Sequence, residues 1–85
     1  MKQFSYVITD AQGIHARPAG TLVKEVKKYE SAITIEKDGK VAKANGVLGV
    51  MSLGVKQGEE VTVKADGADE DAAIAALEAF FKANL

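Results

Sequence analysis

The segment AITIEKDGKVAK, residues 32–43, contains two β-rich runs on either side of the dipeptide Asp38-Gly39. A two-residue turn of this type has the backbone twist that best matches the twist of paired strands. We therefore predict an antiparallel hairpin with strands over residues 32–37 and 40–43.

Two further segments have the alternating pattern of a half-buried strand. They lie at residues 4–9, before the hairpin, and at residues 60–65, after it. A period of two places every second side chain on the same face of a sheet. Tyr6 and Ile8 are predicted to share one face of the first strand, and Val61, Val63 and Ala65 to face inward from the last.

Three segments are predicted to be helices. Apolar residues recur at helical spacing from residue 16 to about residue 28, with lysines largely opposite, and again after a turn at residues 66–69. A short apolar run from Asn45 to about Leu53 indicates a third helix, capped by Asn45 or Gly46. The apolar positions of the two longer helices are Ala19, Leu22, Val23, Val26, Ala73, Ile74, Leu77, Phe80 and Phe81. The carboxylates placed where the dipole of the last helix favours negative charge are Asp69, Glu70 and Asp71.

The order of these elements is strand, helix, strand, strand, short helix, strand, helix. It predicts an α+β fold of two layers, with three helices on one face of a mainly antiparallel four-stranded sheet. A chain of 85 residues suffices for one core, so we expect a single domain over residues 1–85. Ferredoxin-like and acylphosphatase-like domains share much of this outline, so the fold alone does not identify the function.

The composition argues against several classes of protein. The chain has 47% hydrophobic and 27% charged residues and no cysteine, which argues against disorder, disulfide bonds and thiolate metal sites. A formal net charge of -1 argues against a general nucleic-acid binder. The first residues lack the apolar stretch of a signal peptide, and no segment approaches the roughly 20 apolar residues of a membrane span. We expect a cytoplasmic protein without membrane insertion, metal or cofactor.

The only histidine, His15, lies in GIHARPA, residues 13–19, where the first strand has ended and a helix begins. A helix start offers unpaired backbone N–H groups and the positive end of the dipole, which together stabilise an anion. Arg17 adds a planar fork of donors that matches phosphate oxygens, and Pro18 is tolerated in the first helical turn. Imidazole can itself carry a covalent intermediate. We interpret His15 as a phosphoryl acceptor and Ala16 and Arg17 as phosphate-binding; a lone histidine without chemistry is the alternative.

Three segments resemble signature regions of the HPr family, the histidine phosphocarriers of the phosphoenolpyruvate-dependent sugar phosphotransferase system. Residues 13–19 are similar to the active site of the family, residues 46–54 to its second signature, and residues 61–70 to its last strand and turn. Together with the length, the resemblance covers essentially the whole chain. It implies the open-faced β-sandwich of this family, in agreement with the predicted order of elements.

The resemblance also implies a function and its partners. Members of the family are not turnover enzymes: they accept a phosphoryl group from phospho-enzyme I on a histidine Nδ1, here that of His15, and pass it to sugar-specific enzyme IIA domains. Arg17 is then expected to stabilise charge on the transferring group. We expect a monomer that carries no cofactor.

A small carrier must bind at least two partner proteins through one shared surface. Val47, Leu48 and Met51 lie on one side of the predicted short helix, and an apolar patch beside a reactive group indicates docking. Periodicity alone allows these side chains to be plain core instead. The resemblance favours docking for Leu48 and Met51 and adds Lys24 and Lys27 as rim contacts. Lysines near the histidine could steer an acidic partner, although a solvated helix face explains most of them.

One position departs from the pattern of the family. Position 46 is usually a serine that a dedicated kinase phosphorylates, and here it is Gly46, which has no hydroxyl. Control through a phosphoserine, and the binding to a catabolite repressor that depends on it, are therefore not expected at this position. Ser31 and Ser52 do not occupy the matching place.

Two other functions compete with that of a phosphocarrier. A regulatory binding module of carbon or nitrogen metabolism with the HPr fold docks on transcription factors or kinases. Such relatives lack the histidine and act through the serine, so His15 and Gly46 both argue against this function. An acylphosphatase-like hydrolase turns over acyl phosphate with water, whereas a carrier takes up phosphate once per molecule.

Overall fold

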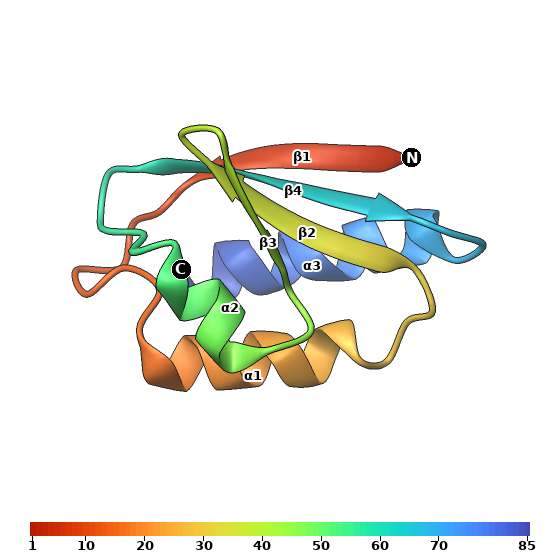
Figure 1. Ribbon diagram of the computed structural model, residues 1–85, viewed down its shortest axis with the longest axis horizontal. Helices are drawn as coiled ribbons and strands as arrows, with labels where there is room; N and C mark the ends of the chain where they lie inside the picture. The colour runs from red at the N-terminus through yellow and green to blue at the C-terminus, as the bar shows by residue number, and fades with distance from the viewer.

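The computed structural model describes all of residues 1–85 and contains four strands and three helices (Figure 1). In chain order these are β1 (Lys2–Val7), α1 (Ala16–Val26), β2 (Ala32–Lys37), β3 (Lys40–Lys43), α2 (Val47–Ser52), β4 (Glu60–Asp66) and α3 (Glu70–Asn84). The strands form one sheet in the order β1-β4-β2-β3, and each neighbouring pair is antiparallel. The predicted α+β class and order of elements are confirmed.

The hairpin of β2 and β3 turns at Asp38-Gly39, as predicted. Both residues have a positive φ, 50° and 81°, which a type I′ turn requires. The register pairs Lys37 with Lys40 beside the turn and Ile35 with Ala42 further along. The choice of two residues that tolerate positive φ therefore sets the pairing of the whole hairpin.

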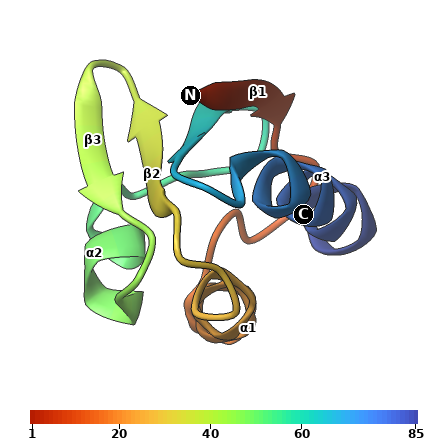
Figure 2. The same ribbon diagram turned by 90° about the vertical axis from the view of Figure 1, so that its right-hand side faces the viewer.

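The helices cover one face of the sheet and leave the other face open (Figure 2). On the covered face, Phe81 of α3 packs edge-on against Phe4 and Tyr6 of β1, with ring centroids 5.5 and 5.8 Å apart. The inward-facing residues of the two central strands are almost completely buried: Ile33, Ile35, Val61, Val63 and Ala65. The two-layer arrangement thus follows from the alternation of β4 and from the apolar faces of α1 and α3.

Polar pairs occupy the open face of the sheet. The hydroxyls of Ser5 and Thr62 lie 3.2 Å apart across β1 and β4. The ammonium of Lys64 lies 3.3 Å from a carboxylate oxygen of Glu36 across β4 and β2. Water can reach these groups, so this face needs no further covering layer.

Three element boundaries differ from those predicted. β1 ends at Val7 because the amides of Thr9 and Asp10 donate to the main-chain oxygen of Leu85 and not to β4. α1 ends at Val26, since the amides of Lys28 and Tyr29 donate to carbonyls only three residues back, as in a tighter helical turn. α2 begins at Val47 with Gly46 as its N-cap, so Asn45 lies outside the helix.

Acidic side chains join the start of α3 to other segments, although none of them caps the amides of the helix. The carboxylate of Asp69, the N-cap, accepts hydrogen bonds from the amides of Glu30 and Ser31 at 2.8 and 2.9 Å and from the Ser31 hydroxyl. Glu70 accepts from the Gly67 amide and lies 2.8 Å from the terminal ammonium of Met1. These hydrogen bonds hold the pKa of both carboxyls below their ordinary values. They bind the loop before β2 and the first residue of the chain to the start of α3.

Candidate functional site

His15 is the N-cap of α1. Its backbone is extended, with φ −97° and ψ −175°, and its carbonyl accepts from the amide of Ala19 at 3.0 Å. Its side chain makes no capping hydrogen bond, and the first turn of α1 contains no acidic residue. The amides of Ala16 and Arg17 have no acceptor within the helix, because the first turn of any helix leaves its N–H groups unpaired. The imidazole thus lies beside two free donors.

One edge of the imidazole faces a carboxylate. The Nε2 atom of His15 lies 3.9 Å from Oδ1 of Asp10, and the histidine side chain is 29% exposed. The same Oδ1 accepts from the amide of Gln12 at 2.8 Å, which holds the carboxylate in a local turn. The Nδ1 atom has no protein partner and is free to react.

The loop that leads to His15 packs closely against residues 54–59. Gly13 has φ 66°, and a Cβ at this position would lie only 2.1 Å from the carbonyl oxygen of Val55. The following amide, that of Ile14, donates to this carbonyl at 3.1 Å. Only glycine allows both the positive φ and the close approach. Gly13 therefore determines where the histidine enters α1.

The end of α3 supports the other side of this loop. The main-chain oxygen of Leu85 accepts from the amide of Asp10 at 2.8 Å and from the hydroxyl of Thr9 at 2.9 Å. The C-terminal residue accordingly lies beside the loop that leads to α1, on the left side of Figure 1. The carboxylate that faces His15 is thus carried on a backbone held from two directions.

Arg17 is exposed at the second position of α1. Its carbonyl accepts from the Thr21 hydroxyl within the helix, and its guanidinium forms no ion pair with another side chain. Lys24 follows seven residues later and so lies nearly above Arg17 on the same exposed face of the helix. The arginine is free to meet an anion bound at the helix start.

α2 packs beside α1 (Figure 1), and some of its apolar side chains are exposed to solvent. Leu48 is 85% exposed and Met51 is 38% exposed, whereas Val50 is fully buried and Val47 is half-buried. The alternative that all these side chains are plain core is therefore wrong for Leu48 and Met51. Their exposure on a helix that packs against α1 is compatible with docking, which stays a prediction.

The two lysines predicted at the rim lie at different distances from the histidine. Both Lys24 and Lys27 are exposed on the outer side of α1. At 1.5 Å per residue, Lys27 lies roughly 18 Å along the helix from His15 and Lys24 roughly 13 Å. The structure therefore places Lys27 at the far end of α1, where it cannot belong to the immediate surroundings of the imidazole.

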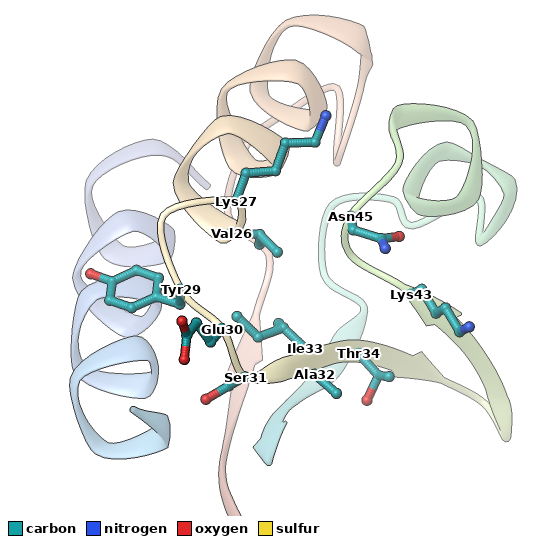
Figure 3. Close-up of a pocket in the computed structure, with 10 residues that line it drawn as sticks. All are labelled: Val26, Lys27, Tyr29, Glu30, Ser31, Ala32, Ile33, Thr34, Lys43 and Asn45. Atoms are coloured by element: carbon teal, nitrogen blue, oxygen red, sulfur yellow. The ribbon is translucent and has the colours of Figure 1, made fainter. Parts of the chain in front are cut away.

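The surface hollow of this molecule lies away from the histidine. It has a volume of about 460 Å³ and lies between the C-terminal end of α1, the start of β2 and the segment at Lys43 and Asn45. Figure 3 shows Val26 and Ile33 beside it, with the ammonium groups of Lys27 and Lys43 directed away. His15 is accordingly a surface site, which suits transfer between two proteins better than capture of a small molecule.

No group of three or more histidine, cysteine, aspartate or glutamate side chains is arranged to hold a metal ion. No helix is both long enough and apolar enough to span a bilayer.

Several residues of the site were missed by reasoning from the sequence. Asp10 carries a weak local signal, since Asp followed by a glycine-containing turn is typical of a carboxylate that accepts from a nearby amide. Leu85, Lys37 and Glu59 carry none, because their contacts join segments far apart in the chain. The carboxyl of Glu59 accepts from the Lys37 ammonium and the Lys56 amide, and these bonds hold its pKa below the ordinary value.

Comparisons with known proteins agree with this geometry. Residues 2–83 match the family model described as "PTS HPr component phosphorylation site". The chain is 46% identical over 77 residues to the phosphocarrier protein HPr of Mycoplasma capricolum, covering 91% of this chain and 86% of that protein.

Solved structures show the same fold. HPr from Thermoanaerobacter tengcongensis is 42% identical and superposes with a TM-score of 0.93 over 98% of this chain and 93% of its own. Crh, the catabolite repression protein of Bacillus subtilis, is 38% identical with a TM-score of 0.79 over 100% and 98%, and is an intertwined dimer with a swapped domain. The family match covers nearly the whole chain, and the fold and the partly exposed histidine accord with it. The chain therefore belongs to the HPr family of the phosphotransferase system, whose members are phosphocarrier proteins and not turnover enzymes.

Proposed function

We propose that His15 accepts a phosphoryl group on Nδ1 from phospho-enzyme I and passes it to the enzyme IIA domains of sugar permeases. The observation that carries this proposal is the position of the imidazole at the open start of α1, with Nε2 toward Asp10 and Nδ1 free. A regulatory binding module needs no such reactive group.

The carboxylate of Asp10 favours the neutral tautomer that carries its proton on Nε2, because that N–H points toward negative charge. Nδ1 then carries the lone pair. In the first transfer this lone pair forms a bond to phosphorus while the bond from phosphorus to the donor atom of enzyme I breaks. The Nε2 proton stays on the ring, and in the second transfer the acceptor atom of the IIA domain displaces Nδ1.

The remaining parts of the site act on the phosphoryl oxygens. The amides of Ala16 and Arg17 donate to them, and the guanidinium of Arg17 stabilises the charge that is spread over them in the transition state. No acidic residue in the first turn of α1 opposes this charge. Leu48 and Met51 then serve as the apolar anchors for both partners, with Val47 beneath them and Lys24 and Lys27 as outer cationic contacts.

Further expectations concern control, assembly and location. Gly46 caps α2 where the family usually has its phosphorylated serine, so treatment with ATP and an HPr kinase is expected to yield no phosphoserine. We infer that the chain acts as a monomer. We infer a cytoplasmic location and no binding of nucleic acid, as expected for a carrier of charge -1 between cytoplasmic enzymes.

The decisive experiment is incubation with phosphoenolpyruvate and enzyme I, followed by intact mass measurement. We expect one acid-labile phosphoryl group per chain and its transfer to an added IIA domain. His15→Ala should abolish the uptake and leave the circular dichroism spectrum unchanged, because the side chain lies at the surface. Ser52→Ala, a matched surface change on α2, should leave the uptake intact. Phosphorylation of the His15→Ala variant would refute the assignment, and steady release of phosphate from acyl phosphate would favour the hydrolase.

A further inference from the structure

One lysine joins the docking helix to the loops of the site. Lys37, the last residue of β2, has a side chain that is only 15% exposed. Its ammonium lies 2.9 Å from a carboxylate oxygen of Glu59, 3.0 Å from the carbonyl of Gly54 and 3.4 Å from the carbonyl of Leu53. An ammonium has three donors, so these contacts can use all of them.

The two carbonyls belong to the end of α2. Leu53 is the C-cap of this helix and Gly54 follows it with φ 61°. A cation at the C-terminal end of a helix stabilises carbonyls that have no intrahelical donor. α2 has only six residues, so it depends on such contacts from outside to stay folded. Lys37 thereby fixes the helix that carries Leu48 and Met51.

Glu59 extends the contact to the other loop of the site. The carboxylate oxygen that meets Lys37 also accepts from the amide of Lys56 at 2.7 Å, while the Glu59 amide donates to the Lys56 carbonyl at 3.1 Å. These bonds close the turn formed by residues 56–59. The Lys37–Glu59 pair thus holds the whole segment between α2 and β4.

This segment in turn holds the residues that precede His15. The carbonyl of Val55 accepts from the amide of Ile14, and the amide of Gly58 donates to the carbonyl of Ile8 at 2.8 Å. The side-chain amide of Gln57 donates to the carbonyl of Thr9 at 3.1 Å. The backbone on both sides of Asp10 therefore rests on the segment that Lys37 and Glu59 hold.

We propose that Lys37 and Glu59 are positioning residues for phosphoryl transfer, which set His15 and the docking helix α2 in a fixed relation to each other. A partner that docks on Leu48 and Met51 must bring its own reactive group in line with Nδ1. A displacement of about 1 Å between docking surface and nucleophile costs up to about 100-fold in rate. This inference rests on the proposed transfer at His15, and it adds residues that touch neither phosphate nor partner.

The test compares Lys37→Met, Glu59→Gln and Lys37→Arg with the wild-type chain. Lys64→Met is the matched control, because Lys64 forms an ion pair of the same kind with Glu36 on the open face of the sheet. Two measurements are made on each protein: the kcat and KM of phosphorylation by enzyme I, and the amide hydrogen exchange of Ile14 and Gly58 relative to Val63 in the core.

Lys37→Met is expected to raise KM and lower kcat, with a combined loss of about tenfold in kcat/KM, within the range for a displaced nucleophile. Exchange at Ile14 and Gly58 should accelerate while Val63 is unchanged. Lys37→Arg should keep kcat/KM and amide exchange close to the wild-type values, since the guanidinium can reach both the carboxylate and the carbonyls. Lys64→Met should change neither.

Three results would overturn the proposal. The first is wild-type kcat/KM and wild-type exchange in Lys37→Met. The second is uniform acceleration of exchange, including Val63, which would show a general loss of stability. The third is failure of the arginine to restore transfer. If Lys37→Met does not fold, Glu59→Gln decides by the same measurements. If the wild-type chain takes up no phosphate, the proposed function fails, and the exchange measurement alone decides whether the pair holds the loop.

Discussion

The two long helices begin in opposite ways, although their backbones offer the same unpaired amides. α3 starts with Asp69 and Glu70, whose carboxylates are already bonded to Ser31 and to the terminal ammonium of Met1. α1 starts with His15 and has no acidic residue in its first turn. The start of α3 thus serves as a structural junction, whereas the start of α1 carries no anion of its own, as the proposed binding of phosphate requires.

The two helix starts also differ in the hydrogen bonds that hold the neighbouring loops. Asp69 holds the neighbouring loop directly through its side chain. The loop before His15 is held by backbone bonds to Val55 and Leu85, which leave the imidazole unused. The second arrangement holds the backbone of the loop without using the donors and acceptors of the imidazole.

The largest effect is expected for the cation at the open helix start. Arg17→Ala should slow transfer from enzyme I by roughly 100- to 1000-fold, the range for removal of one donor that stabilises transition-state charge. Stopped-flow phosphorylation measures the rate of transfer, and a separate binding titration measures the affinity for enzyme I. Lys24→Ala, which removes a cation two turns further on, should have a small effect. Equal losses of affinity and rate in Arg17→Ala would make Arg17 a docking residue instead.

The next largest effect is expected for the exposed apolar side chains of α2. Leu48→Ala and Met51→Ala should each weaken binding to enzyme I by about 1–2 kcal/mol, because apolar anchors dominate an interface. Isothermal titration calorimetry gives the affinities. Val41→Ala is the control, since Val41 is also exposed, at 61%, but lies on the edge strand β3. A loss for Val41 as large as that for Leu48 would argue against a docking surface on α2.

A carboxylate introduced into the first turn of α1 gives this helix an acidic start like that of α3. Ala16→Asp is expected to stabilise the protein by about 0.3–1 kcal/mol through the helix dipole. It should slow phosphorylation at least about fivefold, because like charges near 4 Å repel by about 1 kcal/mol even in water. Thermal unfolding and the transfer assay test both effects, with Ala16→Asn as the uncharged control. Faster transfer in Ala16→Asp would contradict the anion-binding role of this helix start.

The smallest effect on transfer is expected for a substitution at the start of α3. The Ser31 hydroxyl, followed by the Glu30 amide, lowers the pKa of Asp69, so the ionised carboxylate stabilises the folded state. This contribution to the free energy of unfolding is fully present above the pKa of about 3.9 that Asp has in the unfolded chain. It is lost as the pH falls through the lower pKa of Asp69 in the folded state. Asp69→Asn should therefore lower the urea midpoint at pH 7, with the difference from wild type shrinking at acid pH.

The same variant separates structure from function. Transfer by folded Asp69→Asn at pH 7 should equal that of the wild type, because Asp69 bonds only to the loop before β2. A transfer rate far below that of the wild type in the folded variant would show that the two helix starts are coupled.

Most of the local structure was predictable, because short-range physics governs it. Asp38-Gly39 tolerates the positive φ of a hairpin turn, and the spacing of Val61 and Val63 follows from the pleat of a strand. The position of His15 at a helix start followed in the same way, from a glycine, a proline and the apolar period after them. Element ends were less predictable, since Thr9 and Asp10 bond to Leu85 from the other end of the chain.

The sheet-and-helix pattern, and the place of the candidate residue His15 at a helix start, were therefore contained in the order of amino acids. Sequence alone could not show that Nε2 of His15 faces Asp10, that Leu48 is exposed while Val50 is buried, or that Lys37 meets Glu59. Turns and the apolar faces of helices and strands depend on residues a few positions apart, which can be read directly from the sequence. Those other contacts join residues brought close only when the helices pack on the sheet, so the tertiary structure decides them.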